Sequence, residues 1–271
     1  MRAVNALPSR STVAHEWKIG AAVGWAMLVI ALLPMVFTGS LHPTFWFQPR
    51  AFLLMLIALI TLLLVTLAQE AIFRGYIFAR LIRAMGPTMA TLLMSAIAAA
   101  ASAFHPQSTR LSILVTFLMS ILLSLAYLRT RALWLPWGMH FAWSASAAIL
   151  FGLPVAGSIG YTAIVDTGAF GPTWLTGGLY GPEGALFTAA VMLGGMFAVF
   201  ALTRDLAWKY TQPEIRPAGY AMDVAPPAEH VAMEQAAKPA PLVQILSTTP
   251  SASSTMPVID EHLRANSQTD S

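Results

Sequence analysis

Long runs of apolar residues alternate with short polar segments along most of this chain. A membrane-spanning helix needs about 20 consecutive, mainly apolar residues, and several runs approach that length. The runs cover residues 17–37, 51–72, 88–104, 111–128, 132–151 and 185–203. The pattern therefore predicts an all-α fold, a polytopic bundle of about six transmembrane helices.

Glycine and proline mark the ends of the predicted helices. The second run continues as a basic helix to Met85, where Met-Gly-Pro breaks the chain. Residues 152–184 form a Gly-rich loop that ends in LTGGLYGPEG and has room for a short interfacial or re-entrant segment. Beyond about residue 211 the chain is rich in Pro, Ala, Ser and Thr, which predicts a disordered tail.

These boundaries divide the chain into four parts. We expect an N-terminal segment (1–16), a first transmembrane helix with its loop (17–50), a helical core (51–203) and a mostly disordered tail (204–271). Most Lys and Arg residues of the flanks fall on the side of the bundle that holds both termini, and only Arg50 and Arg110 fall on the other. Positive flanks stay in the cytoplasm, so both termini are predicted to be cytoplasmic.

Composition agrees with a membrane protein. The 271 residues are 57% hydrophobic and only 10% charged, whereas soluble domains carry about 25% charged residues. The absence of cysteine excludes a disulfide framework and a thiolate metal site. The net charge of +3 is spread over several loops, so the expected partner is the lipid bilayer and not nucleic acid.

Four ionisable residues interrupt apolar surroundings: Glu70, Arg74, His105 and His140. Such groups are costly at membrane depth and usually face the interior of a bundle for a functional reason. Glu70 and Arg74 share one helix face and can pair, because they are four positions apart. Counted from the break after Met85, Glu70 and His105 lie about 24 and 28 Å along antiparallel helices, and His140 lies about 15 Å along its own helix. We expect one cavity that holds Glu70, His105 and His140 and opens toward the cytoplasm.

The chemistry of this cluster is limited. Asp166 and Glu183 lie in the Gly-rich loop and are interpreted as solvated acids, so no second acid accompanies the histidines. Neither GxSxG nor HExxH occurs. A carboxylate beside an Arg is a usable base for water, and two histidines either bind a metal or hold an oxyanion. Water-activated hydrolysis inside the membrane fits these residues best.

Three motifs resemble those of a known family. QEAIFRG (69–75) is similar to a Glu-Glu-x-x-x-Arg motif, His105 after a small-residue helix to Phe-x-x-x-His, and WLPWGMHFAWS (134–144) to His-x-x-x-Asn. Their order and spacing resemble the CAAX protease and bacteriocin-processing (CPBP) family of intramembrane metalloproteases, also called the type 2 CAAX prenyl protease or Abi family. Gln69 stands at the family's usual first Glu, Ala101 at its Phe and Ser144 at its Asn.

The resemblance implies a function. It implies hydrolysis of a peptide bond in a membrane protein or peptide substrate, by a multi-pass protein of the bacterial cytoplasmic membrane whose protease core is 51–203. The implied catalytic residues are Glu70, Arg74, His105 and His140, with support from Gln69 and Ser144. A divalent metal, such as zinc, would be held by His105, His140 and Glu70. Glu70 would take the water-activating role that Gln69 cannot fill, because an amide is no general base.

Two other functions remain open at this point. Gln69 and Ser144 depart from the family motifs and suggest a family member without catalytic activity. Such a protein would act as a membrane scaffold or bacteriocin-immunity protein on the same fold. Intramembrane Glu and His residues also serve proton relays in transporters. The polar residues gather at one depth instead of lining a path, which argues against transport.

Overall fold

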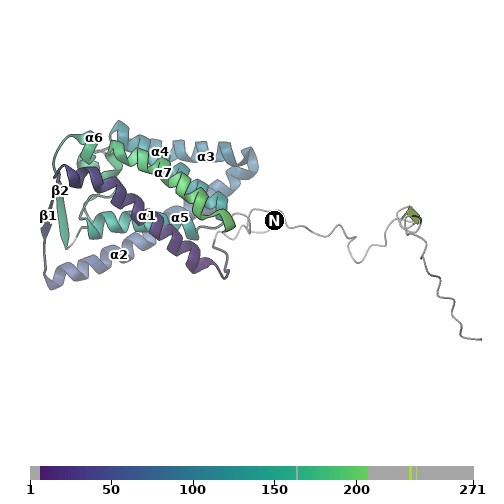
Figure 1. The fold of residues 1–271 in the computed structure, drawn as a ribbon, viewed down its shortest axis with the longest axis horizontal. Helices are drawn as coiled ribbons and strands as arrows, with labels where there is room; N and C mark the ends of the chain where they lie inside the picture. The colour runs from purple at the N-terminus through teal and green to yellow at the C-terminus, as the bar shows by residue number, and fades with distance from the viewer. Residues whose placement is uncertain (1–6, 163, 207–231, 234–235, 237–271) are drawn as a thin grey trace, which may run out of the picture. The chain divides into compact units, whose positions relative to one another are not determined.

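A computed structural model describes residues 7–206, except residue 163, together with residues 232, 233 and 236. The chain divides into two units, 1–214 and 215–271, and everything below concerns the first. Its described part is mostly helical (Figure 1). The predicted tail lies outside the described residues, apart from the few named above.

Three long apolar helical segments are candidate membrane spans. They are α1 (Val13–Phe37), the continuous segment Pro49–Ala103, and α4 (Arg110–Thr130). α7 (Leu186–Leu202) is apolar but shorter. Nine large apolar side chains of α2 are exposed, from Phe52 to Val65, and a contiguous apolar surface of this kind marks contact with lipid. These features indicate an integral membrane protein, and the count of six spans stays a prediction.

The segment Pro49–Ala103 has three helical parts. α2 (Pro49–Glu70) runs into a π-helix, η1 (Ala71–Phe78), which continues as α3 (Ala79–Ala103). Gly86 interrupts α3 with φ 81° and ψ 167°, outside helical geometry, and Pro87 follows it. The chain therefore bends at the break that Met-Gly-Pro predicts, because Gly tolerates positive φ and Pro cannot continue the preceding helix.

α1 packs along α5 (Trp134–Ala145) at close range (Figure 1). A Cβ atom on Gly24 would lie 2.2 Å from the carbonyl oxygen of Met139, and one on Gly138 would lie 2.4 Å from that of Trp17. Only glycine permits such an approach of two helix backbones, which is common between membrane helices. The contact fixes the height of α5, and therefore of His140, in the bundle.

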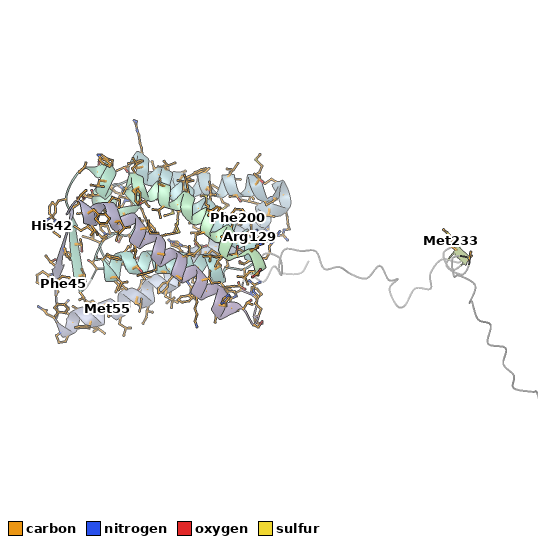
Figure 2. All side chains as sticks on the ribbon, viewed as in Figure 1. His42, Phe45, Met55, Arg129, Phe200 and Met233 are labelled. Atoms are coloured by element: carbon orange, nitrogen blue, oxygen red, sulfur yellow. The ribbon has the colours of Figure 1, made fainter. Side chains whose placement is uncertain are left out.

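The main core lies between α1, α4, α5 and α7. Leu28, Leu122, Trp143 and Met192 are almost fully buried there and contribute one residue from each helix. At the end of α7, the Arg129 side chain donates hydrogen bonds to Phe200 O (3.2 Å) and Thr203 Oγ1 (3.1 Å). Arg129 also lies over the Phe200 ring. Figure 2 labels both residues. A cation that binds the last carbonyls stabilises a helix end.

The all-α expectation needs one correction. β1 (Leu41–Phe45) and β2 (Val165–Ala169) form a two-stranded antiparallel sheet in which Leu41 pairs with Ala169 and Phe45 with Val165. The strands are short, and their partners are far apart in sequence, so periodicity gives no signal for them. β2 also shows that the Gly-rich loop is folded. That loop further contains α6 (Thr173–Thr176) and two 3₁₀ turns, η3 (Gly178–Tyr180) and η4 (Pro182–Gly184).

Candidate active site

One cavity of about 540 Å³ contains all the predicted site residues. Its walls come from α2, η1, α3, α4, α5, α7 and the Gly-rich loop. The six predicted residues that line it are Gln69, Glu70, Arg74, His105, His140 and Ser144. The expectation that three helices bring Glu70, His105 and His140 to a single cavity agrees with this geometry.

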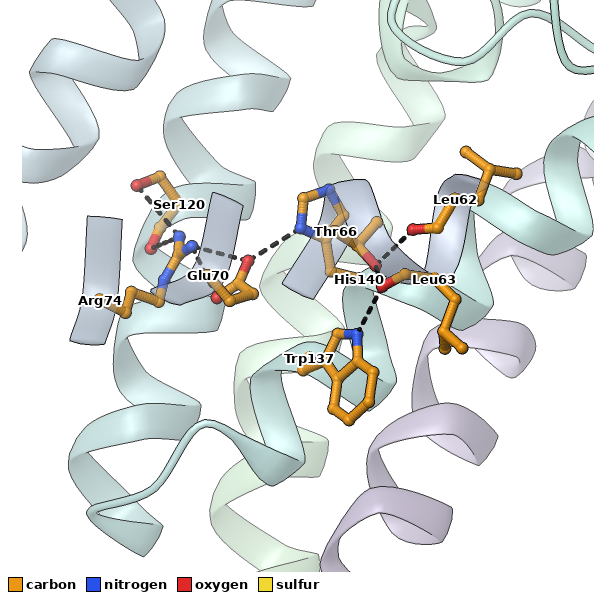
Figure 3. A network of polar contacts seen from close by, with 8 residues as sticks. All are labelled: Leu62, Leu63, Thr66, Glu70, Arg74, Ser120, Trp137 and His140. Carbon is orange, nitrogen blue, oxygen red and sulfur yellow. Dashed lines mark hydrogen bonds and ion pairs between the residues drawn. The ribbon is translucent and has the colours of Figure 1, made fainter. Parts of the chain in front are cut away.

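Glu70 is the last residue of α2 and is fully buried. Arg74 Nη1 donates to both of its carboxylate oxygens, at 2.8 Å each, and Arg74 Nη2 lies 3.3 Å from Ser120 O on α4 (Figure 3). The predicted i,i+4 ion pair is therefore present. Arg74 lies in the π-helix η1, and π-helical turns occur often at functional sites.

His140 of α5 completes a chain of three charged or polar groups. His140 Nδ1 lies 2.8 Å from Glu70 Oε1 (Figure 3). Because the Glu70 carboxylate has only acceptors, the Nδ1–H donates, and Nε2 is left as the proton acceptor of the neutral ring. α5 is also tied to α2 by Trp137 Nε1, which donates to Leu63 O at 3.2 Å. His140 is thus held in one orientation, with 24% of its side chain accessible.

His105 lies apart from this pair. It follows α3 and packs edge-on against Tyr180 of η3, with ring centroids 5.7 Å apart. Across the described part of the chain, no group of three or more His, Asp or Glu side chains is close enough to hold a metal ion. Glu70, His105 and His140 therefore do not form the predicted metal-ligand set, and both Glu70 oxygens already bind Arg74. Zinc remains an expectation from the resemblance, and this arrangement does not fit it.

Gln69 and Ser144 contribute different surfaces to the cavity. Gln69 is exposed, whereas the neighbouring Glu70 is buried, because successive helical residues point in different directions. Ser144 is buried and lies one helical turn after His140. The position where the resembling family has its main carboxylate is thus the accessible one, and here it holds an amide.

Glu183 was interpreted from the sequence as a solvated loop acid, and this was wrong. It lies in η4 and lines the cavity, and Trp143 Nε1 donates a 2.8 Å hydrogen bond to its Oε1. Burial raises the pKa of Glu183 above its ordinary value. The Trp143 hydrogen bond, nearby His140 and the Ala156 backbone oppose that rise without cancelling it. The Gly and Pro residues of LTGGLYGPEG were the available signal, since they build the turn that carries Glu183. Asp166, by contrast, is exposed as predicted.

A second polar chain lies on the His105 side of the cavity. The Tyr180 hydroxyl lies 3.1 Å from Ser102 Oγ, and Thr116 Oγ1 donates to Ser102 Oγ at 3.3 Å. Burial raises the pKa of Tyr180, with Glu183 as a smaller contribution in the same direction, and its hydrogen bonds to Ser102 and Thr116 oppose the rise. Tyr180 therefore keeps its proton and offers the cavity a neutral hydrogen-bond donor.

Comparison with known proteins supports the motif-based resemblance. Residues 50–146 match the model of a family described as type II CAAX prenyl endopeptidase Rce1-like. This confirms the predicted relation to the CPBP family over that segment, and the family indicates a membrane peptidase. The matched segment includes Glu70, Arg74, His105 and His140 and ends before Glu183. Searches of curated proteins and of solved structures find no match.

Proposed function

We propose that this chain is an intramembrane endopeptidase that hydrolyses a peptide bond of a membrane-associated protein or peptide. One observation carries the proposal: the motif residues of the Rce1-like segment, from separate helices, line a single cavity in which Glu70 orients His140. The surrounding apolar helix surface supports a location within the lipid bilayer. Cytoplasmic termini and a bacterial inner membrane belong to this proposal as well.

His140 activates water in this mechanism. A water molecule in the cavity gives a proton to Nε2, and its oxygen attacks the substrate's carbonyl carbon. Glu70 holds the Nδ1–H and stabilises the imidazolium that forms, as a carboxylate does in other carboxylate–histidine pairs. Glu70 lines the cavity but is fully buried, and its carboxylate already binds Arg74 and His140, so the water-activating role is assigned to the more accessible His140. This replaces the expectation that Glu70 is the base.

The remaining residues have positioning and charge-stabilising roles. Arg74 pairs with the Glu70 carboxylate and holds it in place. The His105 and Tyr180 side of the cavity offers N–H and O–H donors for the oxyanion that forms on the substrate carbonyl. No step here passes through a metal, because the residues present do not gather into a ligand set.

The test uses purified full-length protein in liposomes with a mixed-sequence library of apolar peptides, read by mass spectrometry. Wild type is expected to release new peptide termini, and His140→Gln is expected to lose at least about 100-fold in rate. Asp166→Asn is a matched control, because that acid is exposed on β2. Equal cleavage by folded wild type and His140→Gln would overturn the mechanism. If neither wild type nor any variant cleaves a peptide, the proposed function is overturned.

The runner-up is a non-catalytic scaffold or immunity protein on the same fold. Its specific support is the accessible amide of Gln69 at the position where the resembling family has its main carboxylate. It predicts that the variant His140→Gln keeps full biological activity in the host while the peptide library stays uncut.

A further inference from the structure

Glu183 is a partly buried ionisable group that the mechanism above does not use. The chain builds its position from several constraints. Gly181 has φ +92°, and a Cβ there would lie 2.3 Å from the Pro154 carbonyl oxygen. Thr188 Oγ1 donates to Pro182 O at 2.6 Å. A turn fixed in this way holds the carboxyl group in one place, and perturbed acids held in cavities are candidates for catalysis.

Trp143 places Glu183 beside His140. Residues three apart on a helix share a face, so His140 and Trp143 both point from α5 into the cavity. The 2.8 Å hydrogen bond from Trp143 to Glu183 therefore brings this carboxyl to the wall next to the His140 ring. Glu183 also interacts electrostatically with His140, as Glu70 does from the opposite element, α2.

The two carboxyl groups of the site have different environments. Glu70 is fully buried and paired with Arg74, whereas Glu183 is half-buried and has no Arg or Lys partner among the described residues. α4 and α7 contribute no titratable side chain to the cavity. The other titratable groups that line it are Glu70, Arg74, His105, His140, Tyr161 and Tyr180. Pairs of acids with opposite environments are commonly divided between ionised and protonated roles.

We propose that Glu183 is the general acid of the reaction, which donates its proton to the leaving amine; this rests on the proposed peptidase function. His140 takes one proton from water, the water oxygen bonds to the carbonyl carbon, and the C–N bond breaks as Glu183 protonates the nitrogen. The proton on His140 then passes to the Glu183 carboxylate, which restores both groups. Water and one peptide bond are consumed, and a carboxylic acid and an amine are formed.

The test compares Glu183→Gln, Glu183→Asp and Asp166→Asn in liposomes with the same peptide library. An amide still accepts from Trp143, so Glu183→Gln keeps the local structure and removes only the acid. We expect kcat to fall by about 100-fold or more with little change in KM. The kcat of wild type is expected to fall as the pH rises and Glu183 ionises. The Glu183→Gln variant is expected to lack this fall. Glu183→Asp is expected to recover part of the rate, and Asp166→Asn to match wild type.

A readout without turnover separates this proposal from the peptidase proposal. Infrared spectroscopy of the full-length protein, as the pH is raised above the ordinary glutamate pKa of 4.5, is expected to show a protonated-carboxyl band that Glu183→Gln lacks and Asp166→Asn retains. If wild type cleaves, His140→Gln does not and Glu183→Gln cleaves at the wild-type rate, the general-acid role is overturned while the peptidase function stands. An absent band overturns the role as well. If wild type cuts nothing, both proposals fail.

Discussion

Glu70 and His140 are 70 positions apart in the sequence, yet Glu70 Oε1 and His140 Nδ1 lie 2.8 Å apart in the wall of the cavity. Arg74 holds the same carboxylate from the other side (Figure 3). The order Arg74, Glu70, His140 fixes the charge of the acid and the tautomer of the histidine together. The catalytic proposal depends on this order.

The first prediction concerns the link between Glu70 and His140. Glu70→Gln keeps a carbonyl acceptor for His140 but removes the charge that stabilises its imidazolium. We expect kcat to fall by about 100-fold or more with little change in KM. Peptide cleavage in liposomes measures this, with Asp166→Asn as the control. A Glu70→Gln variant that keeps the wild-type kcat would contradict the orienting role.

The second prediction concerns the stability of the ion pair. Removal of one partner of a buried pair leaves an uncompensated charge, which costs about 3–5 kcal/mol. Glu70 is 0% and Arg74 7% exposed, so Arg74→Met is expected to lower the free energy of unfolding by roughly that amount. The double variant Glu70→Gln, Arg74→Met should lose less than the sum of the two single variants. Additive losses in thermal unfolding would show that the two side chains are not coupled.

The third prediction concerns the pH dependence of stability. The pKa of Glu183 is raised above its ordinary value of 4.5, so the folded chain binds this proton more tightly than the unfolded chain. Its contribution to stability is full below pH 4.5 and is lost as pH rises through the raised pKa. The glutamine of Glu183→Gln does not titrate, so the Tm of this variant is expected to rise relative to the Tm of wild type as the pH increases. A constant difference in Tm between wild type and Glu183→Gln across that pH range would refute the raised pKa of Glu183.

The fourth prediction concerns the contact between α1 and α5. A methyl group on Gly24 would collide with the backbone of Met139, the neighbour of His140, so Gly24→Ala must push the helices apart. We expect a loss of about 1–3 kcal/mol in unfolding free energy, together with reduced cleavage. Gly194→Ala on α7 is the matched control, because no atom lies within 4 Å of its Cβ position. Equal Tm values for the two variants would argue against the close packing.

Much of the helical architecture followed from the sequence. Apolar runs of about membrane-spanning length predicted the helices observed as α1, α4 and α7. The Gly86-Pro87 pair predicted the bend in α3. The spacing of Glu70 and Arg74 predicted their pair, since four residues span one helical turn. Local patterns of this kind depend only on near neighbours in the chain.

The parts that could not be predicted depend on distant contacts. β1 and β2 are each too short to show a period, and they exist because they pair with each other. Glu183 was misjudged because a Gly-rich loop has no periodicity, and only the folded turn directs this acid toward Trp143. His105 lies in the same cavity as Glu70 and His140, as expected, but helical rise gives depth and not direction, so it did not predict that the ring packs against Tyr180.

The most direct test of the central claim is a survey of the N-terminal peptides of membrane proteins in the host, with wild type and His140→Gln expressed at equal levels. The account predicts new N-termini in the wild-type sample that vanish in the variant, which would establish proteolysis and identify the substrate. Identical surveys, with both proteins shown to be present and folded, would contradict the claim and favour the non-catalytic scaffold.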